Sequence, residues 1–157
     1  MRVAIRPGGL DHPQVRALLA EHVAFGRAHS PAANAHVLEA GGLDTPAISF
    51  WSAWDGDMLA GFVALRELTP DHGEVKSMRT ATAYLRRGVA RALLDHVVST
   101  ARARGYPRLS LETGTAAAFG PANRLYEMAG FVDGPVFGGY PASPHNRFMT
   151  IVMPDQR

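Results

Sequence analysis

A strand–helix–strand pattern in the middle of the chain most constrains the fold. Residues 73–80, GEVKSMRT, alternate along the chain as a strand does, and residues 108–113, RLSLET, form a second short strand. Between them, apolar residues recur at helical spacing from about 87 to 104, and Gly105 and Pro107 end the helix. A strand, a crossover helix and a second strand form a right-handed parallel unit. We therefore predict a parallel strand pair in the sheet.

The rest of the chain supplies mostly antiparallel strands. The other expected elements are a strand at 3–7, a helix over about 11–29, a short helix from Pro31 to about Glu39, strands at 47–54 and 58–68, a helix from Pro121 to Gly130, and strands near 131–137 and 147–153. Asp55-Gly56-Asp57 is a hairpin turn signal. The sum is a single α/β domain over residues 1–157: a mixed, mostly antiparallel sheet with helices on both faces.

Composition excludes several classes of protein. The chain has 157 residues and no cysteine, which excludes a disulfide scaffold, a thiol nucleophile and cysteine-ligated zinc. It has no run of about 18 apolar residues that would span a membrane. The N-terminal apolar stretch is too short for a signal peptide, so we expect a cytoplasmic protein that does not bind membranes.

The charge of the chain is unevenly distributed. Residues 79–108 contain seven arginines and one acid, Asp95, so this span carries +6. The whole chain carries +2, so the remaining residues carry −4. A local positive patch on an acidic body suits a compact polyanion. Nucleic acid usually requires a more extended basic surface, and we expect no nucleic-acid partner.

The segment YLRRGVARALL, residues 84–94, places two arginines directly before a helix. Arg86 and Arg87 oppose the positive end of the helix dipole, which costs a few tenths of a kcal/mol or more. The free N–H groups of a first helical turn bind anions, and Gly88 lets a ligand approach the backbone. The chain contains neither a P-loop nor a dinucleotide fingerprint. These residues predict an anion site of another kind.

Several motifs, taken together, resemble the GCN5-related N-acetyltransferase (GNAT) family. LRRGVARALL is similar to the family's [QR]-x-x-G-x-[GA] pyrophosphate loop, with Leu85 at the first position. ANRLYEMAGF is similar to the family's A-x-x-L-Y-x-x-x-G-F helix and strand. An asparagine often found seven residues before the tyrosine is replaced here by Phe119. The resemblance extends over the whole chain, is most specific for residues 73–131, and is closest to small bacterial members with unassigned substrates.

The resemblance implies acetyl-CoA as co-substrate, and it assigns the residues that bind it. Its pyrophosphate would accept hydrogen bonds from the backbone N–H groups of Arg87, Gly88, Val89, Ala90 and Arg91. The side chains of Arg86 and Arg91 would support this contact, since guanidinium suits phosphate. The parallel strands would splay apart, so that pantetheine pairs with the backbone of Met78 and Thr80. The Met78 N–H would then polarise the thioester carbonyl.

The same resemblance assigns two catalytic side chains. Tyr126 would protonate the leaving thiolate, because a phenol with a pKa of about 10 can donate a proton to a thiolate whose conjugate acid has a pKa near 8.5. Glu74 lies where some members have a glutamate general base; alternatively, it pairs with a cation such as Lys76, or Glu112 is the base. His72 and His145 are expected in surface loops. We identify no convincing metal site.

The expected activity is transfer of an acetyl group from acetyl-CoA to a primary amine of a small molecule, by direct attack in a ternary complex. A homodimer is possible in this family. Two alternatives stay open: a protein or peptide N-acetyltransferase, which would need an open groove beside the acceptor site, and an acyl-CoA-binding module without turnover. An arginine near the acceptor would favour a substrate with a carboxylate.

Overall fold

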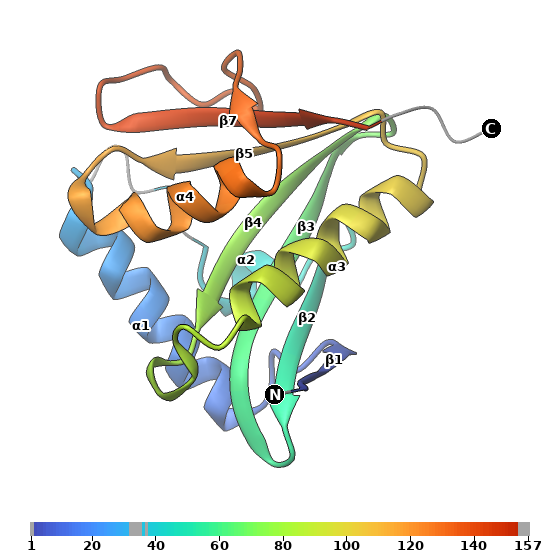
Figure 1. Ribbon diagram of the computed structural model, residues 1–157, viewed down its shortest axis with the longest axis vertical. Coiled ribbons are helices and arrows are strands. Elements are labelled where there is room, and N and C mark those ends of the chain that lie inside the picture. Colours follow the sequence, from blue (N-terminus) through green and yellow to red (C-terminus); the bar gives the residue numbers. More distant parts are fainter. Residues whose placement is uncertain (1, 32–35, 37, 154–157) are drawn as a thin grey trace.

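The structure is a computed structural model that describes residues 2–31, 36 and 38–153. Its described strands form one seven-stranded sheet in the order β1-β2-β3-β4-β5-β7-β6 (Figure 1). The strands are β1 (Ala4–Pro7), β2 (Ile48–Asp55), β3 (Met58–Thr69), β4 (His72–Thr80), β5 (Arg108–Gly114), β6 (Val132–Asp133) and β7 (Asn146–Val152). The α-helices are α1 (Pro13–His29), α2 (Ala40–Leu43), α3 (Val89–Ala103) and α4 (Gly120–Met128). Every strand pair is antiparallel except β4–β5, as expected from the sequence.

Two hydrophobic clusters cover opposite faces of the sheet. Helix α3 buries a stripe against one face, and this stripe consists of Val89, Leu93, Leu94, Val97 and Ala101. Helix α1 covers the other face with Val15, Leu18 and Leu19. Neighbouring residues of β3 alternate between the clusters, with Phe62 on the α1 side and Val63 on the α3 side. Because a buried leucine contributes about 1.5–3 kcal/mol, these stripes fix both helices on the sheet.

The parallel strands β4 and β5 pair over only part of their length. Their described register covers three positions, from His72 opposite Arg108 to Glu74 opposite Ser110. Beyond Glu74 the two strands diverge, and Figure 1 shows the opening widening toward α1 and α4. Strand β5 pairs instead with β7 along its whole length. The backbone of β4 after Glu74 therefore has a neighbour on the β3 side only.

Strand β4 contains one extra residue at the point where the two strands diverge. Its pairing with β3 shifts between Phe62–Arg79 and Ala64–Lys76, so three steps on β4 match two on β3. Ser77 lies in this bulge with a φ of 47°, in the left-handed region. One added residue reverses the side-chain alternation. Arg79 thus lies on the α1 side with Lys76, and Met78 packs with the cluster under α3.

Three details differ from the sequence-based expectations. The short helix from Pro31 to Glu39 falls largely outside the described residues, and the one-turn helix α2 follows where a loop is expected. The strand at 131–137 is reduced to two residues, since Gly134 and Pro135 interrupt it. His72 is buried in β4, where it pairs with the Ser110 hydroxyl at 2.7 Å, and is not a loop residue.

No described helix has the length and apolar character needed to cross a membrane.

Substitution of Gly61 tests the close contact between β3, β4 and α3. A Cβ on Gly61 would lie 2.6 Å from the Arg79 carbonyl oxygen and 3.1 Å from Leu93 Cδ1. We expect Gly61→Ala to lower the free energy of unfolding by about 2 kcal/mol, because overpacking forces the backbone to shift. Gly41→Ala is the matched control, since its Cβ meets nothing within 4 Å. Chemical denaturation measures both; a Gly61→Ala protein as stable as the parent would contradict this packing.

Candidate active site

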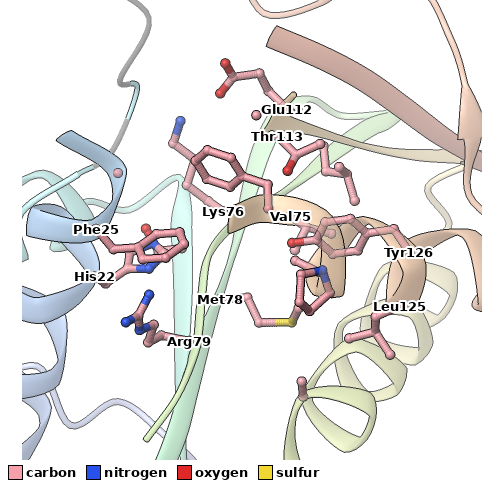
Figure 2. Close-up of a pocket in the computed structure, with 18 of the residues that line it drawn as sticks. His22, Phe25, Val75, Lys76, Met78, Arg79, Glu112, Thr113, Leu125 and Tyr126 are labelled. Atoms are coloured by element: carbon pink, nitrogen blue, oxygen red, sulfur yellow. The ribbon is translucent and has the colours of Figure 1, made fainter. Parts of the chain in front are cut away.

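A cavity of about 490 Å³ occupies the opening between β4 and β5. Strand β4 forms one wall from Glu74 to Thr80, and β5 forms another from Leu111 to Gly114. Helices α1 and α4 close the cavity on two further sides, and Figure 2 shows their side chains converging on one space. This volume is typical of small-molecule sites.

The backbone of β4 presents unpaired polar groups to this cavity. The Ala81 N–H donates to the Ala60 carbonyl at 2.8 Å, and the Arg79 carbonyl also faces β3, next to Gly61. Backbone groups alternate in direction along a strand, so those of Met78 and Thr80 face away from β3. Strand β5 does not pair with β4 at these positions. A ligand with amide groups can therefore add to this edge as a further strand would.

Tyr126 lies on α4 and lines the cavity. Figure 2 shows its hydroxyl directed away from the helix into the cavity. The ring packs edge-on against Phe131 with centroids 6.1 Å apart, which fixes its orientation. Burial raises the pKa of Tyr126 to about 12, so the phenol stays protonated at neutral pH. The group is therefore available as a hydrogen-bond or proton donor.

Glu74 is buried at the closed end of the cavity within a polar cluster. Its side chain is 1% exposed, and its Oε2 accepts a hydrogen bond from the Tyr140 hydroxyl at 2.8 Å. Lys76 Nζ lies 3.7 Å from the same oxygen and donates to the Tyr140 hydroxyl and to the His36 carbonyl. Arg66 lies 3.8 Å from Oε1, which accepts no hydrogen bond from the described residues. The expected alternative of a Glu74–Lys76 pair is thus present.

The electrostatics of this cluster are set mainly by burial. Burial raises the pKa of Glu74, while Lys76, the Tyr140 hydrogen bond and Arg66 oppose the rise. Burial also lowers the pKa of Lys76, against the attraction of Glu74 and Glu112. A carboxylate with a raised pKa and one free oxygen accepts a proton more readily than a solvated one.

Glu112, the second candidate base, lies on β5 at the other side of the same cavity end. Its Oε2 contacts His36 Nδ1 at 2.8 Å and accepts a hydrogen bond from the Asn146 amide. His36 also stacks on the Tyr140 ring with centroids 4.8 Å apart. Glu74 and Glu112 therefore share one polar network, in which Glu112 has the more complete set of hydrogen bonds.

The predicted anion loop lies at the start of α3, beside the mouth of the cavity. Gly88 is the N-cap residue with a φ of 82°, and Arg86 also has a positive φ, of 62°. Left-handed residues in a turn help backbone N–H groups to converge on an anion. The first intrahelical bond runs from the Ala92 N–H to Gly88, so the preceding N–H groups of the helix have no helical acceptor. Arg91 pairs with Asp95 at 2.9 Å on the helix surface.

The structure places half of the predicted site residues around the cavity and the other half next to it. Its cavity is lined by Glu74, Met78, Thr80, Ala90 and Tyr126. Arg86, Arg87, Gly88, Val89 and Arg91 lie in the adjoining loop and helix start and do not line it. Sequence reasoning gave no site role to His22, Phe25 or Lys76. Two signals were present: Lys76 is the only lysine of the chain, and His22 and Phe25 continue the helical stripe of Leu18.

The sequence model of the Acetyltransferase (GNAT) family matches residues 15–131, about three quarters of the chain. The chain belongs to the GNAT family. A relative from Bacillus subtilis (strain 168), named an uncharacterized N-acetyltransferase, YsnE, is 49% identical over 93% of this chain and 97% of its own length. A second relative, the uncharacterized N-acetyltransferase YedL from Escherichia coli (strain K12), is 45% identical over 95% of this chain and 94% of its own length.

Solved structures agree with the GNAT fold. An acetyltransferase from Bacillus subtilis, crystallised in complex with CoA, superposes with a TM-score of 0.68 at 15% identity, over 97% of this chain and 99% of that one. At 15% sequence identity, this structural similarity shows the fold alone. The protein is thus a GNAT N-acyltransferase, with the family's mixed sheet and one parallel pair, β4–β5.

Removing the Tyr140 hydroxyl tests the buried cluster. We expect Tyr140→Phe to lower the free energy of unfolding at pH 8 by about 1.5–3 kcal/mol, because a hydrogen bond to a charged group is lost. That bond lowers the pKa of Glu74, so the variant raises it further. The loss is therefore largest above the raised pKa and smaller below about 4.5, where Glu74 is protonated in both folded and unfolded states.

Denaturation at a series of pH values measures this effect. Tyr106→Phe is the matched control, because Tyr106 donates to Glu67 at 2.7 Å outside the cluster. A Tyr140→Phe loss that does not change with pH would show that the hydroxyl does not influence the Glu74 carboxylate.

Proposed function

We propose that the protein transfers the acetyl group of acetyl-CoA to a primary amine of a small molecule, by direct attack in a ternary complex. The observation that carries the proposal is the cavity between β4 and β5. It begins at the unpaired backbone of Met78 and Thr80, passes Tyr126, and ends at the buried carboxylate of Glu74 and the partly buried carboxylate of Glu112. It thus presents a thioester site, a proton donor and a proton acceptor in one space.

Acetyl-CoA is the co-substrate of the proposal, and both the site and the comparisons support it. The pyrophosphate binds the N–H groups at the start of α3, from Arg87 to Arg91, where the helix dipole favours negative charge. The pantetheine arm then follows β4, pairing with Met78 and Thr80. A structural neighbour is crystallised with CoA, which agrees with this path.

The chemistry follows from these positions. Glu74 removes a proton from the substrate ammonium, and the free amine attacks the thioester carbonyl carbon. The Met78 N–H stabilises the oxyanion that forms. The carbon–sulfur bond then breaks and Tyr126 gives its proton to the sulfur. The nitrogen, positively charged after the attack, releases its second proton to the Tyr126 phenolate through water, and Glu74 returns the first proton to the solvent. The products are the N-acetylated amine and CoA, and no metal takes part.

A small acceptor suits the site better than a protein does. Helix α1, His36 and Asn146 line the acceptor end of the cavity, and Tyr140 contacts Glu74 and Lys76 there. A protein substrate needs an open groove there, to hold several residues on each side of the acetylated amine. Glu74 and Lys76 are both buried at this end, which favours a small acceptor.

Tyr126→Phe tests the proton donor. We expect kcat to fall by about 10²- to 10⁴-fold, the usual contribution of a general acid, while the affinity for acetyl-CoA stays within a few-fold. Release of free thiol from acetyl-CoA, measured across a panel of amines, gives the rate. Tyr106→Phe serves as the control. If the parent protein binds CoA but acetylates no amine, it is a binding module and the proposal fails.

Glu74→Gln tests the base through the pH dependence of kcat/KM. A general base works only when deprotonated, and burial raises the pKa of Glu74. Activity of the parent should therefore fall with decreasing pH along a limb centred above the ordinary glutamate value of about 4.3. Glu74→Gln should lose about 10- to 10³-fold in rate and also lose this limb. If it keeps both, and Glu112→Gln loses them, Glu112 is the base.

A further inference from the structure

One cationic side chain in the cavity has no role in the chemistry above. Arg79 follows the bulge of β4, and its guanidinium lies 4.6 Å from the centroid of the Phe25 ring on α1. The side chain lines the cavity and is partly buried. In the described part of the chain, Arg79 forms no hydrogen bond or ion pair. The charge that acts on it from a distance is that of the exposed Glu21. A guanidinium in such a position lacks the anion that usually accompanies it.

His22 lies beside Arg79, one helical turn before Phe25. Its Nδ1 is buried and has no hydrogen-bond partner among the described residues. Burial, reinforced by the charge of Arg79, lowers the pKa of His22 to about 4, so the ring is neutral at pH 7. A neutral imidazole still has one N–H to donate. Figure 2 shows His22, Phe25 and Arg79 together on the α1 side of the cavity.

The other charged side chains of the cavity, unlike Arg79, have partners within the protein. Lys76, the second cation that lines it, already contacts Glu74 and Tyr140. The carboxylates Glu74 and Glu112 lie near Lys76, and Figure 2 separates Glu112 from Arg79 across the cavity. The cavity thus has an acidic region, which suits an ammonium, and a separate cationic region at Arg79.

Aromatic side chains form the wall beside this cationic region. Phe119 packs edge-on against Phe25 with centroids 5.4 Å apart, and both rings line the cavity. Phe119 thus presents an apolar ring to the cavity. An apolar substrate body of ring size matches such a wall.

We infer that the acceptor is an amino acid with an apolar side chain, whose carboxylate binds Arg79 and His22 while its amino group faces Glu74 and the thioester. Arginine binds a carboxylate through two parallel hydrogen bonds, and the imidazole adds a third donor. The inference rests on the proposed acetyl transfer and names the class of its substrate. Arg79 and His22 are binding residues and take no part in proton transfer.

Matched acceptors test the role of the carboxylate. L-phenylalanine and 2-phenylethylamine differ only in that group. We expect the parent enzyme to acetylate L-phenylalanine with a kcat/KM about 10- to 100-fold higher, in line with a charge-assisted hydrogen-bond pair. Arg79→Gln should remove this preference, mainly by raising KM for L-phenylalanine. Arg16→Gln, an exposed arginine on α1, is the control and should keep the preference.

A binding experiment separates this inference from the proposed activity. With CoA present, N-acetyl-L-phenylalanine should bind the parent at least tenfold more tightly than N-acetyl-2-phenylethylamine by calorimetry, and Arg79→Gln should abolish the difference. A parent with no carboxylate preference, or an Arg79→Gln protein that keeps it, overturns the inference. If no amine is acetylated, the proposed activity fails, and the binding comparison still decides whether Arg79 holds a carboxylate. Circular dichroism checks that the variants are folded.

Discussion

The site depends on one backbone irregularity, the extra residue of β4 at Ser77. In a regular strand Arg79 would face α3 and Met78 would face α1. The bulge reverses this order, so that the cation enters the acceptor side and Met78 packs under α3. It lies just beyond the last β4–β5 pair, where the strands diverge. A single residue in the left-handed region therefore decides on which side of the sheet Met78 and Arg79 lie.

Burial of charge gives the closed end of the cavity its chemistry. Two carboxylates and one lysine share a network through Tyr140 and His36. Burial raises the pKa of Glu74 and lowers the pKa of Lys76. Such a network is costly unless its members are paired. Glu74 Oε1 is buried and accepts no hydrogen bond from the described residues, which is consistent with a group that must accept a proton.

The sequence predicted much of the fold because its signals are local. The α3 stripe, the caps at Gly88 and Gly105 and the hairpin around Gly56 act within a few residues, and the parallel pair follows from its crossover helix. Motifs predicted the anion loop and the role of Tyr126, and Tyr126 lines the cavity. The Ser77 bulge leaves no such signal, since serine is not typical of a positive φ. The alternation of residues 73–80 alone places Arg79 on the wrong side of the sheet. The contact between Arg79 and Phe25 therefore cannot be predicted unless the bulge is known.

The same physical argument connects the two ends of the proposed ligand path. At the start of α3, Arg86 adopts a left-handed conformation that costs a non-glycine residue about 1–2 kcal/mol, and Arg86 and Arg87 lie at the positive end of the helix dipole. In the proposed complex, a bound pyrophosphate offsets this cost. At the proposed acceptor end, Arg79 is partly buried and forms no ion pair with the described residues, and in the inferred complex a substrate carboxylate offsets that cost in turn. The two proposed ligands thus bind at different cationic sites, and each adds its own binding energy to the ternary complex.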